Sequence, residues 1–232
     1  MTSQQLHEFG TSIIHEVHSL WEQKKKLYPS GYEVFYGPLR FRPTLFLVGV
    51  NPGGGKESAR LGMEKLAPED SDMEYITSTG KDGYPLAQRT CPIFQHIGYL
   101  ETLAKSVKTN LNFFRSKQDS LLPKEDALFC RAHVIRIIEM LQPGALFCEG
   151  VTVFDEMRGT LYAKHKLRSC QEYSREGRRK YVSMICDEPA LPRLLIGICH
   201  LSPTYRRPTS EDCAKIGEHL KIDLDTILGR PR

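Results

Sequence analysis

The chain has 232 residues, a formal net charge of +4 and 40% hydrophobic residues, an ordinary composition for a globular protein. No apolar run is long enough to cross a bilayer, and no basic segment followed by an apolar stretch opens the chain. We therefore expect an intracellular protein, of the cytoplasm or nucleus, with no membrane partner. The mild positive charge permits nucleic-acid binding but does not require it.

The seven cysteines are spread singly along the chain and form no C-x-x-C pair. This spacing argues against a disulfide framework, a zinc site and a four-cysteine iron–sulfur cluster. Several cysteines lie in apolar runs such as "ALFC", where Cys behaves as a small hydrophobic residue. We expect a reducing compartment, and neither a metal nor another cofactor.

The predicted elements alternate between helix and strand. Apolar residues with helical spacing predict a helix over 4–25, and "RPTLFLVGV" is typical of a buried strand. The segment 56–66 favours a short helix, and the polar segment 67–90 favours a long loop. Further helices are predicted over 91–106, 122–141, 151–161 and 209–228, and further strands in 108–114, 143–150 and 192–203.

Two further segments lie between the third and fourth of these strands. The strongly basic segment 164–180 is expected to be exposed, and "YVSMICD" is a candidate extra strand. Strands that alternate with helices at this spacing indicate a parallel sheet covered on both faces. The sequence thus predicts an α/β fold, a three-layer α/β/α arrangement with a central four-stranded, mostly parallel sheet.

The first glycine-rich stretch is "GVNPGGGKES", which directly follows a predicted strand. A phosphate-binding loop requires Lys and Ser/Thr directly after its second glycine, but Gly55 intervenes and Glu57 replaces the hydroxyl residue. The dinucleotide pattern also fails, because Ser58 stands where its last glycine belongs. The free N–H groups of such a turn still attract anions, and its glycines admit a ligand closely.

Polar residues follow the first and last predicted core strands. Asn51 and His200 both stand at carboxyl ends, where α/β folds place their ligands. Either residue alone is also compatible with a structural role, since Asn caps turns well. Downstream of His200, Tyr205, Arg206 and Arg207 offer an aromatic face and cations, which suits nucleic acid or an ordinary exposed loop.

"GVNPGGG" followed far downstream by "HLSP" resembles the uracil-DNA glycosylase superfamily. Its members carry a first motif G-x-[ND]-P-G and a second motif H-P-S-P, each at the end of a core strand. The first motif fits, whereas Leu201 replaces the usual Pro of the second. The resemblance covers roughly residues 40–225 and is nearest to the Asn-containing mismatch-specific and single-strand-selective branches. It implies one glycosylase-like domain over 1–232, in which 1–40 is an N-terminal helical extension.

The resemblance implies roles for the matching residues. Asn51 matches the residue that orients the attacking water, and His200 the residue that hydrogen-bonds the uracil carbonyl. Asn110 matches the asparagine that reads the base edge; Asn112, two residues on, is the alternative. Because an amide is a poor base, we expect slower turnover than with Asp in place of Asn51.

The base-stacking aromatic of the family has no direct counterpart. Leu86 stands at its position, and Tyr84 is the nearest aromatic. The other residues expected to contact the substrate are Gly49, Val50, Pro52 and Gly53. The residues expected to contact DNA are Gly54, Lys56, Ser202, Tyr205, Arg206 and Arg207.

The leading prediction is a monomeric, monofunctional DNA glycosylase that removes uracil or a related damaged base from single-stranded or mismatched DNA. Leu201, Leu86 and the long loop motivate an alternative: a glycosylase-fold module that binds a base or nucleotide without cleaving it. A third possibility is a nucleotide hydrolase that uses the segment 53–56. The leading prediction requires the side chains of Asn51 and His200 to converge on one cleft.

Overall fold

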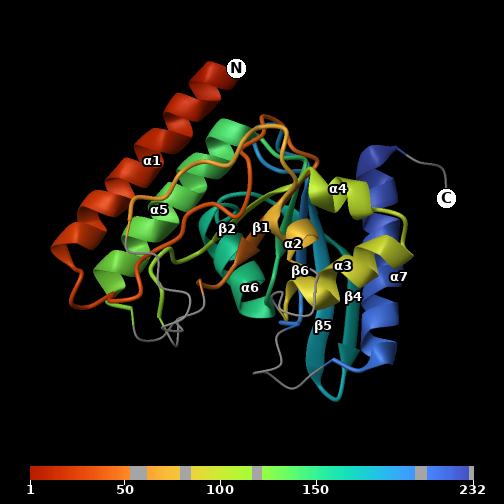
Figure 1. Cartoon of the computed structure of the whole chain (residues 1–232). Helices are drawn as coiled ribbons and strands as arrows, with labels where there is room; N and C mark the ends of the chain where they lie inside the picture. Colours follow the sequence, from red (N-terminus) through yellow and green to blue (C-terminus); the bar gives the residue numbers. More distant parts are fainter. Residues whose placement is uncertain (53–61, 79–84, 117–121, 202–207, 230–232) are drawn as a thin grey trace.

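The computed structural model describes residues 1–52, 62–78, 85–116, 122–201 and 208–229. Its elements surround one β-sheet (Figure 1). The helices are α1 (Ser3–Gln23), α2 (Glu74–Thr77), α3 (Ala87–His96), α4 (Leu100–Ala104), α5 (Lys124–Leu141), α6 (Val151–Thr160) and α7 (Ser210–Leu228). The strands are β1 (Leu45–Gly49), β2 (Val107–Asn110), β3 (Ala145–Cys148), β4 (Leu167–Arg175), β5 (Arg178–Cys186) and β6 (Leu194–Ile198).

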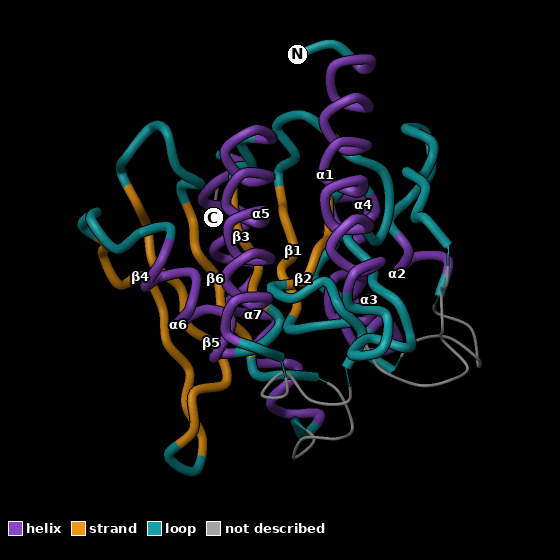
Figure 2. The backbone as a smooth tube through the Cα atoms, turned by 90° about the vertical axis from the view of Figure 1, so that its left-hand side faces the viewer, coloured by secondary structure: helices purple, strands orange, loops and turns teal. Residues whose placement is uncertain are grey.

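The sheet has six strands in the order β2-β1-β3-β6-β5-β4. The first four are parallel to one another, and β5 and β4 extend the sheet as antiparallel neighbours. The predicted α/β class and mostly parallel sheet are therefore confirmed, but the four-stranded sheet is wrong. Figure 2 shows β4 and β5 as a long hairpin beyond the parallel strands.

The β4–β5 hairpin was predicted in part: the candidate extra strand "YVSMICD" falls mostly within β5, whereas no strand was predicted for β4. The hairpin contains most of the basic segment 164–180, and most outward residues of β4 are exposed, as predicted for that segment. Glu176 and Gly177 both have positive φ, 53° and 69°, in the two-residue connection that suits the twist of paired strands. An edge strand needs only one buried side, so a polar segment can still complete a sheet.

Helices cover both faces of the sheet (Figure 1). The alternation of side chains along β1 sends Phe46 and Val48 into a core shared with α1, α5 and α6. It sends Leu45 and Leu47 into a second core, shared with α3 and α7. Two cores on opposite faces give three layers, helix on sheet on helix.

The N-terminal 40 residues pack into the first core. Trp21 of α1 is 2% exposed, and its ring nitrogen donates to the carbonyl oxygen of Tyr28 at 3.0 Å. Tyr28 stacks on Phe114, with ring centroids 4.4 Å apart. The N-terminal segment is thus held against the residues that follow β2.

Most predicted helices are present, with three differences. The helix predicted over 91–106 is divided, because Gly98, with φ of 78°, separates α3 from α4. The segment 67–90, predicted as a loop, contains α2 and the start of α3. The described part of 56–66, residues 62–66, is irregular rather than helical. The predicted cap of the last helix is present, since Thr209 and Asp212 form a capping box.

Candidate functional site

Polar residues gather at the carboxyl edge of the parallel strands. Asn110 ends β2 and is level with Gly49, which ends β1. Glu149 directly follows β3, and His200 stands two residues beyond the end of β6. Continued alternation from Phe147 to Glu149 and from Ile198 to His200 puts these polar residues on the face of the second core. Four neighbouring strand ends therefore contribute to one polar edge.

Asn110 lies directly over Gly49. A Cβ built at position 49 would overlap Oδ1 of Asn110 and would lie 3.3 Å from Oε2 of Glu149. Gly49 therefore provides room for two polar side chains above the end of β1. The amide nitrogen of Asn110 donates to the hydroxyl of Tyr36 at 2.6 Å, and Asn110 is only 4% exposed. Asn110 is thus oriented by a buried phenol.

An ion pair lies beside Asn110. The ammonium of Lys108, on β2, donates to Oε2 of Glu149, and the hydroxyl of Tyr75 donates to Oε1 at 2.7 Å. Both charged side chains are almost fully buried, at 4% and 1% exposure. The ammonium also lies 4.7 Å from the ring centre of Tyr75 and 5.3 Å from that of Tyr36. The carboxylate is thus fully engaged by donors.

The imidazole of His200 lies against Gly150, the residue after Glu149. A Cβ built on Gly150 would lie 3.9 Å from Cδ2 of His200. Burial lowers the pKa of His200 below its usual 6.5; the carboxylate of Glu149 raises it and the ammonium of Lys108 lowers it by smaller amounts. His200 is therefore a neutral imidazole at pH 7 and senses both members of the ion pair.

Asn51 stands two residues beyond the end of β1 and is anchored to the segment that follows β2. Its amide nitrogen donates to the carbonyl oxygen of Ser116 at 2.9 Å and to the Ser116 hydroxyl at 3.1 Å. Asn51 is partly exposed, and Pro52 beside it is buried. These two bonds direct the amide nitrogen of Asn51 toward Ser116, so its carbonyl oxygen points away from Ser116.

Three further residues that the sequence singled out, Asn112, Leu86 and Leu201, lie in or against the core. Asn112 is 1% exposed and lies beyond the end of β2, and its N–H donates to the carbonyl oxygen of Val50 at 3.0 Å. Leu86 precedes α3 and packs partly against the second core. Leu201 is fully buried, and its carbonyl oxygen accepts from Arg89. Leu201 therefore serves the core at the position where the glycosylase motif has Pro.

Several predicted site residues lie outside the described ranges. They are Gly53, Gly54, Lys56, Tyr84, Ser202, Tyr205, Arg206 and Arg207. Among the predicted residues that the structure does describe, Asn110 and Gly49 are in contact, and His200 is coupled electrostatically to the same edge.

Sequence reasoning missed Glu149, Lys108, Tyr36 and Tyr75. A signal existed for two of them. Glu149 follows the apolar run "ALFC" just as Asn51 and His200 follow theirs, and Lys108 stands two residues before Asn110, hence on the same strand face. Tyr36 and Tyr75 come from an irregular segment and a four-residue helix, where no periodic pattern marks them.

Three arginines of the basic β4–β5 region pair with acidic side chains. Arg168 pairs with Asp187 at 3.1 Å, Arg175 with Glu211 at 2.7 Å and Arg179 with Asp155 at 2.5 Å. These exposed pairs contribute little to stability, but they place a carboxylate beside each of these three arginines.

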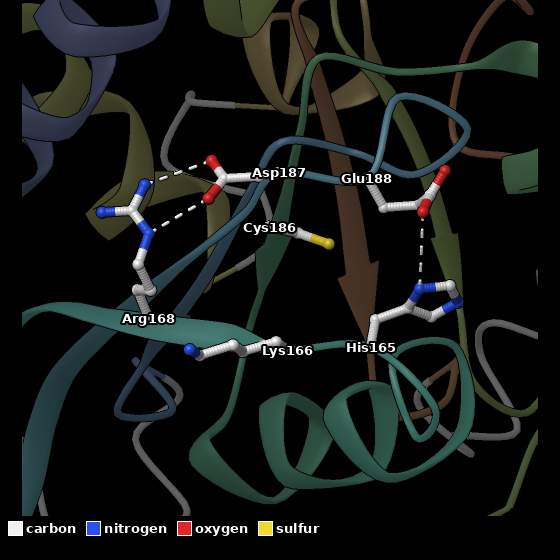
Figure 3. A pocket seen from close by; sticks show the side chains of 6 residues that line it. All are labelled: His165, Lys166, Arg168, Cys186, Asp187 and Glu188. Atoms are coloured by element: carbon white, nitrogen blue, oxygen red, sulfur yellow. Dashed lines mark hydrogen bonds and ion pairs between the residues drawn. The ribbon is translucent and has the colours of Figure 1, made fainter.

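A hollow of about 330 Å³ lies where β4 begins and β5 ends, next to the start of β6 (Figure 3). It therefore lies near the amino end of β6, whereas Glu149 and His200 follow the carboxyl ends of β3 and β6. In Figure 3, Arg168 faces Asp187 and His165 faces Glu188 across it, 3.9 Å apart in the second pair. These charged groups of the hollow pair with each other. The hollow is therefore separate from the polar edge.

No protein-family model matches the chain, and no curated protein matches its sequence. Within the described ranges, no helix is both long and apolar enough to cross a membrane. In the same ranges, no three His, Cys, Asp or Glu side chains are grouped so that they could hold a metal ion.

Proposed function

We propose that the chain is a monofunctional DNA glycosylase that hydrolyses the N-glycosidic bond of uracil or a related damaged base. The observation that carries this proposal is the polar edge, where Asn110 lies over Gly49 and the neutral imidazole of His200 follows β6, on one face of the four parallel strands. Gly49 and His200 belong to the motifs "GVNPGGG" and "HLSP", which resemble those of uracil-DNA glycosylases.

His200 supplies the electrostatic part of the reaction. Breaking the bond leaves negative charge on the departing base, and a donor aimed at the developing oxyanion typically lowers the barrier by about 3–4 kcal/mol. A neutral imidazole can donate one ring N–H without losing its own proton to the base. The lowered pKa of His200 supports this role at pH 7.

Asn51 orients the attacking water. Ser116 holds its amide nitrogen through two hydrogen bonds, so the carbonyl oxygen is directed away from that contact and can accept a hydrogen bond from water. An amide cannot remove a proton efficiently, and general-base help is worth about 10²–10⁴ in rate. Turnover is therefore slower than with a carboxylate at this position.

Asn110 reads the base. One amide hydrogen is directed to Tyr36, and the group retains a second hydrogen and a carbonyl oxygen. A donor–acceptor pair of this kind matches O4 and N3–H of uracil, whereas cytosine presents the opposite pattern and leaves buried groups unpaired. The lysine beside it, Lys108, is engaged in an ion pair with Glu149, so the reaction is assigned to water rather than to an amine.

The substrate is DNA in which the target base leaves the stack. This step costs a few kcal/mol in a duplex and less at a mismatch or in a single strand, which favours those two substrates. Stacking on the base by Tyr84 or Leu86, and contacts to DNA from Gly54, Lys56 and the segment 202–207, are part of the proposal on sequence grounds.

An oligonucleotide panel tests the proposal. Single strands and duplexes with one uracil, opposite G or A, are incubated with the protein and then treated with alkali, which cleaves at abasic sites. We expect cleavage at the uracil and a large loss in His200→Ala. A lack of abasic product at excess protein contradicts the proposal, and tight binding without product supports a binding module instead. Magnesium-dependent release of phosphate from a nucleoside triphosphate would indicate a nucleotide hydrolase.

A further inference from the structure

The ion pair between Lys108 and Glu149 has no part in the proposed chemistry, although it lies within the polar edge. Both side chains are almost completely withdrawn from solvent. Two charges are costly to bury, and hydrophobic residues of similar size are often as stable, so a retained pair is weak evidence for a role in stability alone. Its position relative to Asn110 and His200 points to another role.

The carboxylate of Glu149 cannot itself activate water. Glu149 is 0% exposed, and its two oxygens accept from Tyr75 and Lys108. A general base must reach the proton that it removes, directly or through one water. Glu149 is therefore a positioning residue, and any effect on the reaction must pass through its neighbours.

The first neighbour is Asn110. Oε2 of Glu149 and Oδ1 of Asn110 both crowd the space over the Cα of Gly49, and Lys108 donates to that same carboxylate oxygen. Two acceptor oxygens this close repel each other; the ammonium that donates to Oε2 offsets that repulsion, and the Tyr36 oxygen accepts from the amide nitrogen. The two ends of the Asn110 amide are thus distinguished, and the amide is held in one orientation.

The second neighbour is His200. Among the described residues, the charged groups that act on its imidazole are Glu149, which follows β3, and Lys108 on β2; Cys199 is its nearest titratable neighbour in sequence. The anion and the cation act in opposite directions on the charged form of the ring. The pair therefore balances the charge that the imidazole experiences.

We infer that the Lys108–Glu149 ion pair is the positioning element of the site: it fixes the orientation of the Asn110 amide over Gly49 and sets the balance of charge beside the imidazole of His200. The inference rests on the proposed function, in which Asn110 reads the base and His200 donates to it. The pair thereby determines both which base is accepted and how fast it leaves.

The titration of His200, followed by NMR in the protein without DNA, tests the electrostatic part. Glu149→Gln removes the anion, so we expect a lower pKa for His200 than in the native protein. The double variant Lys108→Met/Glu149→Gln also removes the cation, so its His200 pKa should rise again relative to Glu149→Gln. The control is Asp223→Asn, which alters another buried carboxylate that accepts from a tyrosine.

Excision kinetics test the positioning part. We expect Glu149→Gln to lower kcat on uracil-DNA by about 100-fold, with KM nearly unchanged. A loss of this size is typical when a group that positions the substrate, here the Asn110 amide, is misplaced by about 1 Å. The double variant buries no charge, so it keeps the measurement possible if Glu149→Gln folds poorly. Its kcat should stay low, because Asn110 has lost the charges that orient it.

Two results would overturn the inference. One is a folded Glu149→Gln or double variant with native kcat and a native His200 titration. The other is an equal shift of the His200 pKa in Asp223→Asn. The titration uses no substrate, so it remains decisive if wild-type protein excises no base, a result that would reject the proposed function alone.

Discussion

The molecule contains two buried carboxylates that resemble each other closely, in different regions. Glu149, at the carboxyl edge of β3, accepts from the hydroxyl of Tyr75 at 2.7 Å. Asp223, on α7, accepts from the hydroxyl of Tyr181 at 2.6 Å. Both residues are 0% exposed. Burial and a tyrosine partner therefore do not distinguish a functional carboxylate from a structural one.

Their other neighbours differ. Asp223 also accepts from Gln171 at 2.6 Å and from the Cys170 thiol at 3.4 Å, and both belong to β4. These bonds attach α7 to the hairpin. Glu149 instead pairs with a lysine and lies beside Asn110 and His200 at the strand ends. The comparison teaches that position among polar strand ends, rather than burial, marks the candidate site.

The largest expected effect is on stability, in Lys108→Met. This change leaves the carboxylate of Glu149 buried without its cation, which typically costs about 3–5 kcal/mol in the free energy of unfolding. Urea unfolding measures it. The counterpart Gln171→Met removes one neutral donor from Asp223 and should cost only about 1–3 kcal/mol. Equal costs would remove the distinction between the two carboxylates.

The next effect is on activity, in His200→Ala. Loss of a donor to the departing base should lower kcat on uracil-DNA by about 100- to 1,000-fold. Asp223→Asn should retain kcat close to that of the native protein, because its neighbours attach a helix. Single-turnover excision assays compare the two, and a comparable loss in both variants would contradict the assignment of the site to the carboxyl edge.

Two buried glycines offer a matched pair with smaller effects. Gly49→Ala places a methyl group on Oδ1 of Asn110, and Gly197→Ala places one 2.6 Å from Cβ of Phe154. Such overpacking costs about 1–3 kcal/mol in stability at each position. Only Gly49→Ala should also change the preference for uracil over cytosine, measured with matched oligonucleotides; the same change in Gly197→Ala would count against the role of Asn110.

The pH dependence should follow His200. Its folded-state pKa is lowered below 6.5, so the imidazole is neutral at pH 7 and becomes protonated only as the pH falls through that lower value. Protonation favours the unfolded state, where the pKa is ordinary. The stability that His200 contributes is therefore fully present above about pH 6.5 and is lost as the pH falls from there through the lower folded-state pKa. A rate profile that falls on the acid side, unchanged in Asp223→Asn, is expected; a profile flat from about pH 5 to 8 would argue against it.

The smallest effect concerns the cysteines. Cys170 is exposed, whereas burial raises the pKa of Cys91 to about 11 and that of Cys130 to about 12. A thiol reagent at neutral pH should therefore modify Cys170 first, as mass spectrometry of digested peptides would show. Because Cys170 contacts Asp223 rather than Glu149, labelling should leave excision nearly unchanged.

The sequence by itself determined the elements whose signal is local. The apolar runs around Phe46, Phe147 and Ile196 predicted β1, β3 and β6, because strands buried on both faces need continuous apolar residues. Helical periodicity predicted α1, α5 and α7. Polar residues directly after such runs predicted Asn51 and His200 as strand-end residues.

Only the tertiary structure decided which distant residues meet. The β4–β5 hairpin extends the sheet because β5 pairs with β6. The charged residues of the hairpin do not predict this pairing. Lys108 and Glu149 are 41 residues apart along the chain, and their contact depends on the strand order β2-β1-β3 and on a glycine beneath them. Their pairing is a property of register and of the low-dielectric interior, and neither can be read from the two residues alone.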